Sequence, residues 1–109
     1  RGFCVAGRDT AAFLEDALSQ LGLTRREANE FIVYWLPQMQ DDPYNLISFQ
    51  SDAYTQAVRL AIDPVPDTLL RVFMAWKPLD TAVDIPAQFL SAPERTGFTA
   101  VEWGGCLVR

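Results

Sequence analysis

The chain has 109 residues, of which half are hydrophobic and 21% are charged, as is typical of one globular domain. Fourteen acidic and nine basic residues give a formal net charge of -5, and the longest basic run is Arg25-Arg26. Because a nucleic-acid-binding surface needs clustered basic residues, nucleic acid is not expected as a partner. The chain has no histidine, which excludes Ser-His-Asp and Cys-His catalysis and HExxH zinc sites within it.

The N-terminal third predicts a strand followed by a helix. Residues 2–6 are short, apolar and β-prone, and they end at Gly7. Asp9 or Thr10 is then placed to cap a helix whose apolar positions, 13, 14, 17, 18 and 21, follow the helical period. Gly22 suits the left-handed position that ends many helices, with Leu23 touching the preceding turn.

A second helix is predicted from Arg25, because Thr24 and Glu27 have the spacing of a capping box. Its apolar stripe at 28, 31, 32, 35, 36 and 39 includes the most aromatic run of the chain. That run of nine residues is too short to cross a bilayer and is bracketed by acidic residues, so it is expected in a core. Pro37 either ends the helix near Leu36 or kinks it, with the helix continuing to about Gln40.

The remaining chain predicts strands at 44–50, 57–63, 69–77 and 98–103, with Pro64 to Asp67 as a connection. The strand 69–77 alternates an apolar face with a face that mixes Arg, Lys and Phe, as expected when helices cover one side only. Residues 78–96 are expected to form a long surface connection held by Ile85, Phe89 and Leu90, and Gly104-Gly105 to follow the last strand. These elements predict an α+β domain, with an N-terminal strand and a two-helix hairpin on one face of a largely antiparallel sheet of four to five strands.

The two cysteines, Cys4 and Cys106, lie near opposite ends of the chain and lack the spacing of a zinc site. If the first and last strands are neighbours, the two thiols could pair in a disulfide. The alternative is two buried, inert thiols.

A mixed charged and aromatic patch is the candidate binding site on the uncovered face or edge of the sheet. Arginine and tryptophan are strong interface anchors because they combine large area with hydrogen-bonding groups. The alternative is that the tryptophans pack inward while the Arg and Glu form a cross-strand ion pair. The patch consists of Arg71, Trp76, Lys77, Glu102 and Trp103.

Other candidate residues are weaker. Tyr34 and Trp35 could reach a ligand from the second helix, although Trp35 lies in the apolar stripe and is expected in the core. Asp41, Asp42 and Asn45 offer oxygen ligands of the kind Ca²⁺ prefers, but no EF-hand pattern surrounds them, so a solvated turn is favoured. No metal site and no cofactor motif are predicted.

Five segments carry a resemblance to a known family: GFCVAGRDTAAFLEDAL, NEFIVYWLPQM, YNLISFQ, LLRVFMAWKPLD and GFTAVEWGG. Together they resemble bacterial, mainly clostridial-type, extracytoplasmic proteins that occur as lipoproteins or as outer portions of membrane proteins. The resemblance implies a location outside the cytoplasmic membrane, secreted or membrane-anchored, and no particular activity. The length indicates that residues 1–109 are a single domain, and the resemblance implies that this domain is the C-terminal part of a longer protein.

Three functions stay open at this point. The first is a non-catalytic interaction or sensor module that meets a protein or a cell-envelope component, with no insertion of this segment into the membrane. The second is a hydrolase or enzyme fragment whose carboxylate pair is drawn from Asp41, Asp42, Asp67 and Glu102, which would need to lie about 5–10 Å apart. The third is a structural accessory domain. The oligomeric state is not predicted.

Overall fold

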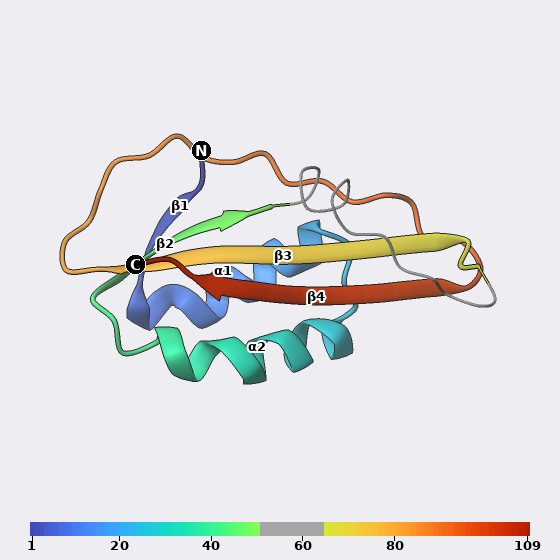
Figure 1. Cartoon of the computed structure of the whole chain (residues 1–109), viewed down its shortest axis with the longest axis horizontal. Helices are drawn as coiled ribbons and strands as arrows, with labels where there is room; N and C mark the ends of the chain where they lie inside the picture. The colour runs from blue at the N-terminus through green and yellow to red at the C-terminus, as the bar shows by residue number, and fades with distance from the viewer. Residues whose placement is uncertain (51–64) are drawn as a thin grey trace.

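The computed structural model describes residues 1–50 and 65–109, and it confirms the α+β class. The chain forms β1 (Phe3–Ala6), a 3-10 turn (Gly7–Asp9), α1 (Thr10–Gln20), α2 (Arg25–Met39), β2 (Tyr44–Phe49), β3 (Thr68–Leu79) and β4 (Thr99–Leu107). The four strands form one sheet in the order β1-β2-β3-β4. Both helices lie on the same side of this sheet, with α2 beside β3 and β4 (Figure 1). The strand predicted at 57–63 lies outside the described residues.

The helix ends follow the sequence signals closely. Gly22 has a φ of +100°, and the Leu23 N–H donates to the Leu18 carbonyl at 3.1 Å, which are the features of a Schellman ending. The capping box is also present, because the Thr24 hydroxyl accepts from the Glu27 N–H and the Glu27 carboxylate accepts from the Thr24 N–H. The α2 helix continues through Pro37 to Met39, as the second of the two sequence alternatives predicts.

The core lies between the helices and the sheet. Phe31, Leu14, Leu18, Met39 and Met74 are fully buried there, and Trp35 is 8% exposed. From β3 the alternate residues Leu70, Val72, Met74 and Trp76 are buried, so the predicted two-faced character of this strand is confirmed. The apolar stripe of α2 and this row of β3 therefore form one continuous core.

The β4 strand departs from the largely antiparallel arrangement. The β1–β2 and β2–β3 pairings are antiparallel, but β3 and β4 are parallel, so the sheet is mixed. A parallel neighbour needs a long return connection, and residues 80–98 supply it by crossing back along the molecule (Figure 1). Gly104 and Gly105 lie within β4 and do not follow it, and the strand runs on to Leu107.

The return connection is fastened mainly by polar groups. The Gly2 N–H donates to the Pro86 carbonyl at 3.1 Å, and the Gln88 side chain bonds both backbone groups of Phe49, at 2.9 and 2.6 Å. Leu90 packs against the core as predicted, but Phe89 is 84% exposed and holds nothing. The prediction for Phe89 was wrong, because composition alone does not show that amide groups fasten the segment.

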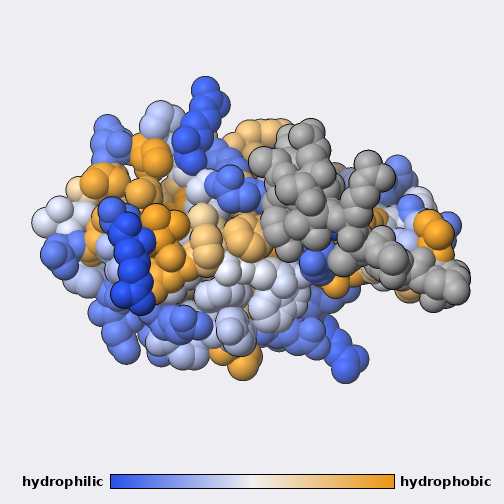
Figure 2. Space-filling model, in the orientation of Figure 1, coloured by the Kyte–Doolittle hydropathy of each residue, from blue (hydrophilic) through white to orange (hydrophobic). Residues whose placement is uncertain are grey.

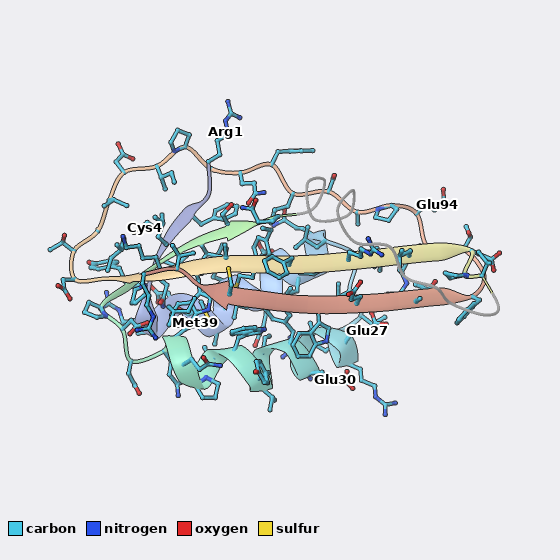
Figure 3. All side chains as sticks on the ribbon, in the orientation of Figure 1. Arg1, Cys4, Glu27, Glu30, Met39 and Glu94 are labelled. Atoms are coloured by element: carbon cyan, nitrogen blue, oxygen red, sulfur yellow. The ribbon has the colours of Figure 1, made fainter. Side chains whose placement is uncertain are left out.

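The two cysteines do not pair. Cys4 lies on β1 and Cys106 on β4, and both thiols are free. β1 and β4 are the opposite edges of the sheet, so about three strand spacings of 4.8 Å separate them, which no disulfide can bridge. Figure 3 labels Cys4 on β1. Cys4 is partly buried and Cys106 is exposed, so the alternative prediction of two buried thiols is also wrong.

We expect titration of the unfolded, non-reduced protein with a thiol reagent to give two free thiols per chain. A monomer with no titratable thiol, and a mass two hydrogen atoms lower than that of the reduced chain, would contradict the separation of β1 and β4.

Candidate functional site

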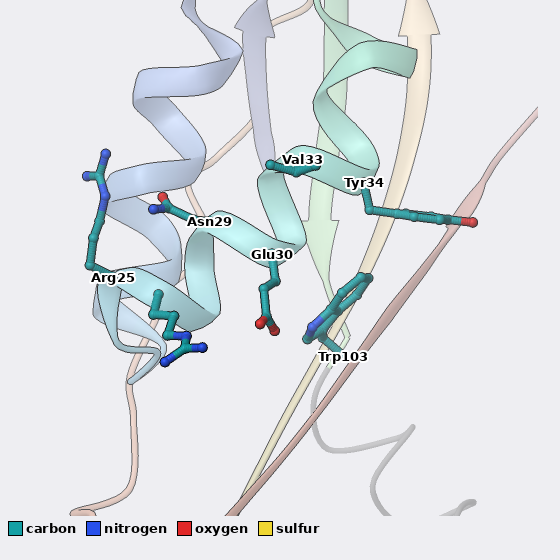
Figure 4. A pocket seen from close by; sticks show the side chains of 7 residues that line it. Arg25, Asn29, Glu30, Val33, Tyr34 and Trp103 are labelled. Carbon is teal, nitrogen blue, oxygen red and sulfur yellow. The ribbon is translucent and has the colours of Figure 1, made fainter.

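The candidate site is an open groove of about 960 Å³ between the outer side of α2 and β4. Six of its lining residues come from the helix, and Trp103 of β4 forms the opposite wall (Figure 4). Among the described residues, Val33 and Tyr34 are the large apolar side chains that the helices expose, at 75% and 58%. The helix residues of the groove are Arg25, Arg26, Asn29, Glu30, Val33 and Tyr34.

Trp103 connects the groove to the core. One side of its indole packs edge-on against the buried Phe31 ring, with centroids 5.2 Å apart, and the Tyr34 ring lies 5.8 Å away on the solvent side. Tyr34 also packs edge-on against Trp35 at 4.8 Å. The aromatic wall is therefore held rigidly by the core while its outer surface is accessible, which is the arrangement of an interface anchor.

The charges around the groove are mixed. Arg25 pairs with Glu15 at 3.3 Å, but both side chains are largely exposed, so this pair adds at most a few tenths of a kcal/mol. Arg26 and Glu30 are exposed on the same side of α2, and Figure 4 shows the Glu30 carboxylate near the Trp103 indole. The groove therefore offers an aromatic and apolar floor with two arginines and one glutamate beside it.

The structure separates the predicted patch into two faces of the sheet. Trp76 is 3% exposed in the core, whereas Trp103 lies on the same side of the sheet but in the groove. Arg71 and Glu102 face each other across β3 and β4 on the other side, with Nε and Oε2 3.2 Å apart, and the Arg71 side chain is only 4% exposed. The cross-strand ion pair given above as the alternative is thus present.

Lys77 is exposed but lies six residues along β3 from Arg71, about 20 Å away. Figure 2 shows apolar side chains bordered by hydrophilic ones on the side of the molecule that faces the viewer. Of the five predicted residues, only Trp103 therefore lies in the groove.

The acidic candidates are not gathered. Asp67 precedes β3 and accepts a hydrogen bond from the Phe98 N–H at 2.7 Å, whereas Asp41 and Asp42 lie in the turn before β2, beside the far end of β3. A strand of twelve residues spans roughly 36 Å between these ends. Glu102 is engaged with Arg71. Asp67 is thus far from Asp41 and Asp42, which are neighbours in one turn.

Asn45 is a structural residue. It is fully buried, and its amide nitrogen donates to the Met39 carbonyl at 2.9 Å and to the Thr10 hydroxyl oxygen at 3.2 Å. It therefore supplies a hydrogen-bond donor to a carbonyl at the end of α2 and links that end to the first residue of α1.

The acidic turn before β2 shows no metal site. Burial raises the pKa of Asp42, and the neighbouring charge of Asp41 adds to this. In the part of the chain that the structure describes, no group of three or more acidic or Cys side chains could hold a metal ion.

Sequence analysis missed an ion pair that joins the return connection to α2. Arg95 donates to both carboxylate oxygens of Glu27, at 2.7 and 3.2 Å, and to the Gly22 carbonyl at 3.0 Å. The hydrogen bond from Arg95 is the main reason that the pKa of Glu27 is lowered to about 2, although burial opposes the shift. Two residues 68 positions apart carry no local signal of their pairing.

This ion pair predicts an acid-sensitive contribution to stability. Because the folded-state pKa of Glu27 is about 2 and the unfolded value is near 4.5, its contribution is complete above about pH 4.5 and is lost as the pH falls toward 2. Glu27→Gln keeps an oxygen for the capping box but removes the charge, so we expect it to lower the free energy of unfolding at pH 7 by about 1–2 kcal/mol.

Urea denaturation at pH 7, 4 and 3 measures this effect. The difference between the wild type and Glu27→Gln should shrink at the lower pH values, whereas Glu94→Gln, at an exposed position, serves as the matched control. A difference that stays constant with pH would contradict the role of the Glu27 charge.

Of the groove residues on α2, Tyr34 was among the weaker candidates, whereas Val33 was missed although the sequence contained a signal. Val33 and Tyr34 are apolar but lie outside the core stripe of α2, and such residues on an amphipathic helix often mark a contact surface.

None of the described helices is long and apolar enough to cross a bilayer. No protein-family model, curated protein or solved structure matches this chain, so the family resemblance stays a prediction.

Proposed function

We propose that this domain is a non-catalytic interaction module that binds a protein partner through the groove between α2 and β4. The observation that carries the proposal is the wall formed by Tyr34 and Trp103, which is anchored in the core by Phe31 and open on its outer side. Aromatic anchors with a rigid base supply most of the binding energy in many protein interfaces. The lack of any histidine supports a binding role over catalysis by a Ser-His or Cys-His pair.

The partner class follows from the groove. Its side chains are aromatic and apolar, with two arginines and one glutamate at the border, and this mixed surface suits a polypeptide better than a nucleic acid or a strongly anionic surface. We include in the proposal the extracytoplasmic location that the family resemblance implies, where the module would meet a protein of the cell envelope.

Site-directed photocrosslinking tests the binding role. A photoreactive phenylalanine analogue at Val33 lies in the groove, whereas the same analogue at Phe89, which is equally solvent-accessible, lies outside it and is the matched control. In cells that make the full-length protein, we expect adducts from position 33 that are absent from position 89 and that decrease at least severalfold when Trp103 is replaced by Ala.

The folded state of Trp103→Ala must first be checked by circular dichroism, since this residue also touches the core. Arg26→Ala is a second groove variant that leaves the core intact, because its side chain is exposed. Equal adduct yields at positions 33 and 89, or yields that neither variant reduces, would contradict the proposal.

A further inference from the structure

The hydrogen-bond pattern between β3 and β4 shows which β4 residues direct their backbone N–H and C=O groups to the outer edge of the sheet. At one end of the β3–β4 pairing the Thr68 N–H donates to the Phe98 carbonyl at 3.1 Å, and at the other end the Val108 N–H donates to the Trp76 carbonyl at 2.7 Å. In the parallel register between these ends, the even-numbered residues of β4 bond to β3. The odd-numbered residues direct both their N–H and C=O groups to the outer edge: Thr99, Val101, Trp103, Gly105 and Leu107.

The two edges of the sheet differ. At β1 the return connection forms a bridge with the edge through Gly2 and Ala87. At β4 no described strand lies beyond the edge. Unpaired backbone groups along a strand of this length readily pair with a further strand. The open edge is also continuous with the groove, because Trp103 belongs to both.

The exposed side of α2 carries a charge pattern that is complementary to itself. Arg26 lies in the first turn of the helix and the exposed Asp41 follows its end, and Val33 and Tyr34 lie midway between these two residues in the sequence. If two such helices lie antiparallel and cross at Val33 and Tyr34, Arg26 of each faces Asp41 of the other. The two exposed apolar residues then meet at the centre.

The centre of the charge pattern on α2, at Val33 and Tyr34, lies next to the centre of the β4 edge, at Trp103. Trp103 is the middle one of the five outward-facing residues of β4, and its ring lies 5.8 Å from that of Tyr34. A single twofold axis near Trp103 would therefore relate both elements to their copies. An isologous contact requires this kind of self-complementarity.

We propose that the groove and the β4 edge are occupied by a second copy of this chain, which forms a twofold dimer through antiparallel β4–β4 pairing. The proposal rests on the proposed function, because it names the partner that fills the groove. Trp103 faces its own copy, Val101 faces Gly105 of the second copy, and Thr99 faces Leu107, with two backbone hydrogen bonds in each facing pair. On the helix side, Arg26 faces Asp41 of the second copy.

Charge reversal tests the helix contact. We expect light scattering coupled to size exclusion to show a concentration-dependent dimer, with Arg26→Glu and Asp41→Arg each weakening association about tenfold and the double variant restoring it. The two residues lie about 22 Å apart along α2 of one chain, so rescue cannot arise within a chain. Glu94→Lys, outside the groove, is the control for net charge and should leave association unchanged.

The existing thiol of Cys106 tests the strand register. In the proposed pairing Ala100 faces Cys106 of the second copy as a non-hydrogen-bonded pair, whose Cα atoms lie about 4.5 Å apart, within disulfide range. Within one chain they are six residues apart along β4, about 20 Å. In a Cys4→Ser background, Ala100→Cys should therefore give a reducible covalent dimer on mild oxidation. Val101→Cys, on the opposite face of β4, should not.

A chain that stays monomeric at all concentrations, or a dimer that neither charge reversal weakens and that Ala100→Cys does not crosslink, would overturn this proposal. If the dimer proposal fails but position 33 crosslinks to a different protein, the proposed function is still supported. Adducts twice the mass of the chain support the dimer, and the absence of all adducts at position 33 counts against both.

Discussion

Replacement of Phe31 by alanine is expected to lower the free energy of unfolding by about 3–5 kcal/mol, the usual range for a large aromatic removed from a core. Phe31 is fully buried on α2, and it packs against Trp35 with ring centroids 6.4 Å apart and against Trp103 at 5.2 Å. Its removal leaves a cavity at the point where α2 meets the sheet, and two surrounding indoles cannot collapse fully into it.

Urea or thermal denaturation measures the loss of unfolding free energy in Phe31→Ala. Val33→Ala is the matched control, because Val33 lies two positions away on the same helix but is 75% exposed, and its loss should be within about 0.5 kcal/mol. Similar losses for the two variants would contradict the assignment of the core stripe. Because Phe31 supports Trp103, we also expect Phe31→Ala to reduce the crosslinking yield at the groove.

Gly7→Ala is expected to destabilise the domain by about 3 kcal/mol or more. A Cβ atom at this position would overlap the carbonyl oxygen of Asp42 and lie 2.7 Å from that of Gln40. Both are backbone atoms of the turn that follows α2, and the Gly7 N–H donates to the Pro43 carbonyl at 3.1 Å in the same turn. The turn therefore cannot move away without breaking its contact with the start of α1.

Gly104→Ala is the matched control for this variant. A Cβ atom at Gly104 would meet only the Phe73 ring, at 3.7 Å, which is an ordinary contact. We expect its unfolding midpoint to stay within a few degrees of the wild type or to rise, because alanine restricts the unfolded chain. An unfolding midpoint of Gly7→Ala that matches that of Gly104→Ala would show that the turn after α2 does not lie against Gly7.

The two helices were predictable because their signals are local. The Schellman ending at Gly22 and the capping box at Thr24 depend on residues within one turn, and the stripe of α2 follows from its period. The alternating burial of β3 was predictable for the same reason, since the side chains of a strand alternate between its faces. Together these local patterns indicated the α+β class and the core.

The order and direction of the strands were decided by the tertiary structure. No residue near Gly97 indicates that β4 runs parallel to β3, because that direction depends on the return path of residues 80–98 across the molecule. The same path brings Arg95 to Glu27 and Gln88 to Phe49, and the strand order places Cys4 and Cys106 on opposite edges. Such contacts depend on where distant segments meet.

The candidate site was half predictable. The sequence by itself determined that Trp103 follows Glu102 on the other face of a strand, and that Val33 and Tyr34 lie outside the core stripe of α2. Only the tertiary structure placed Trp103 against Tyr34, buried Trp76 and paired Arg71 with Glu102. The physical reason is that helical and strand periods determine which way a side chain faces, whereas packing between elements determines what it faces.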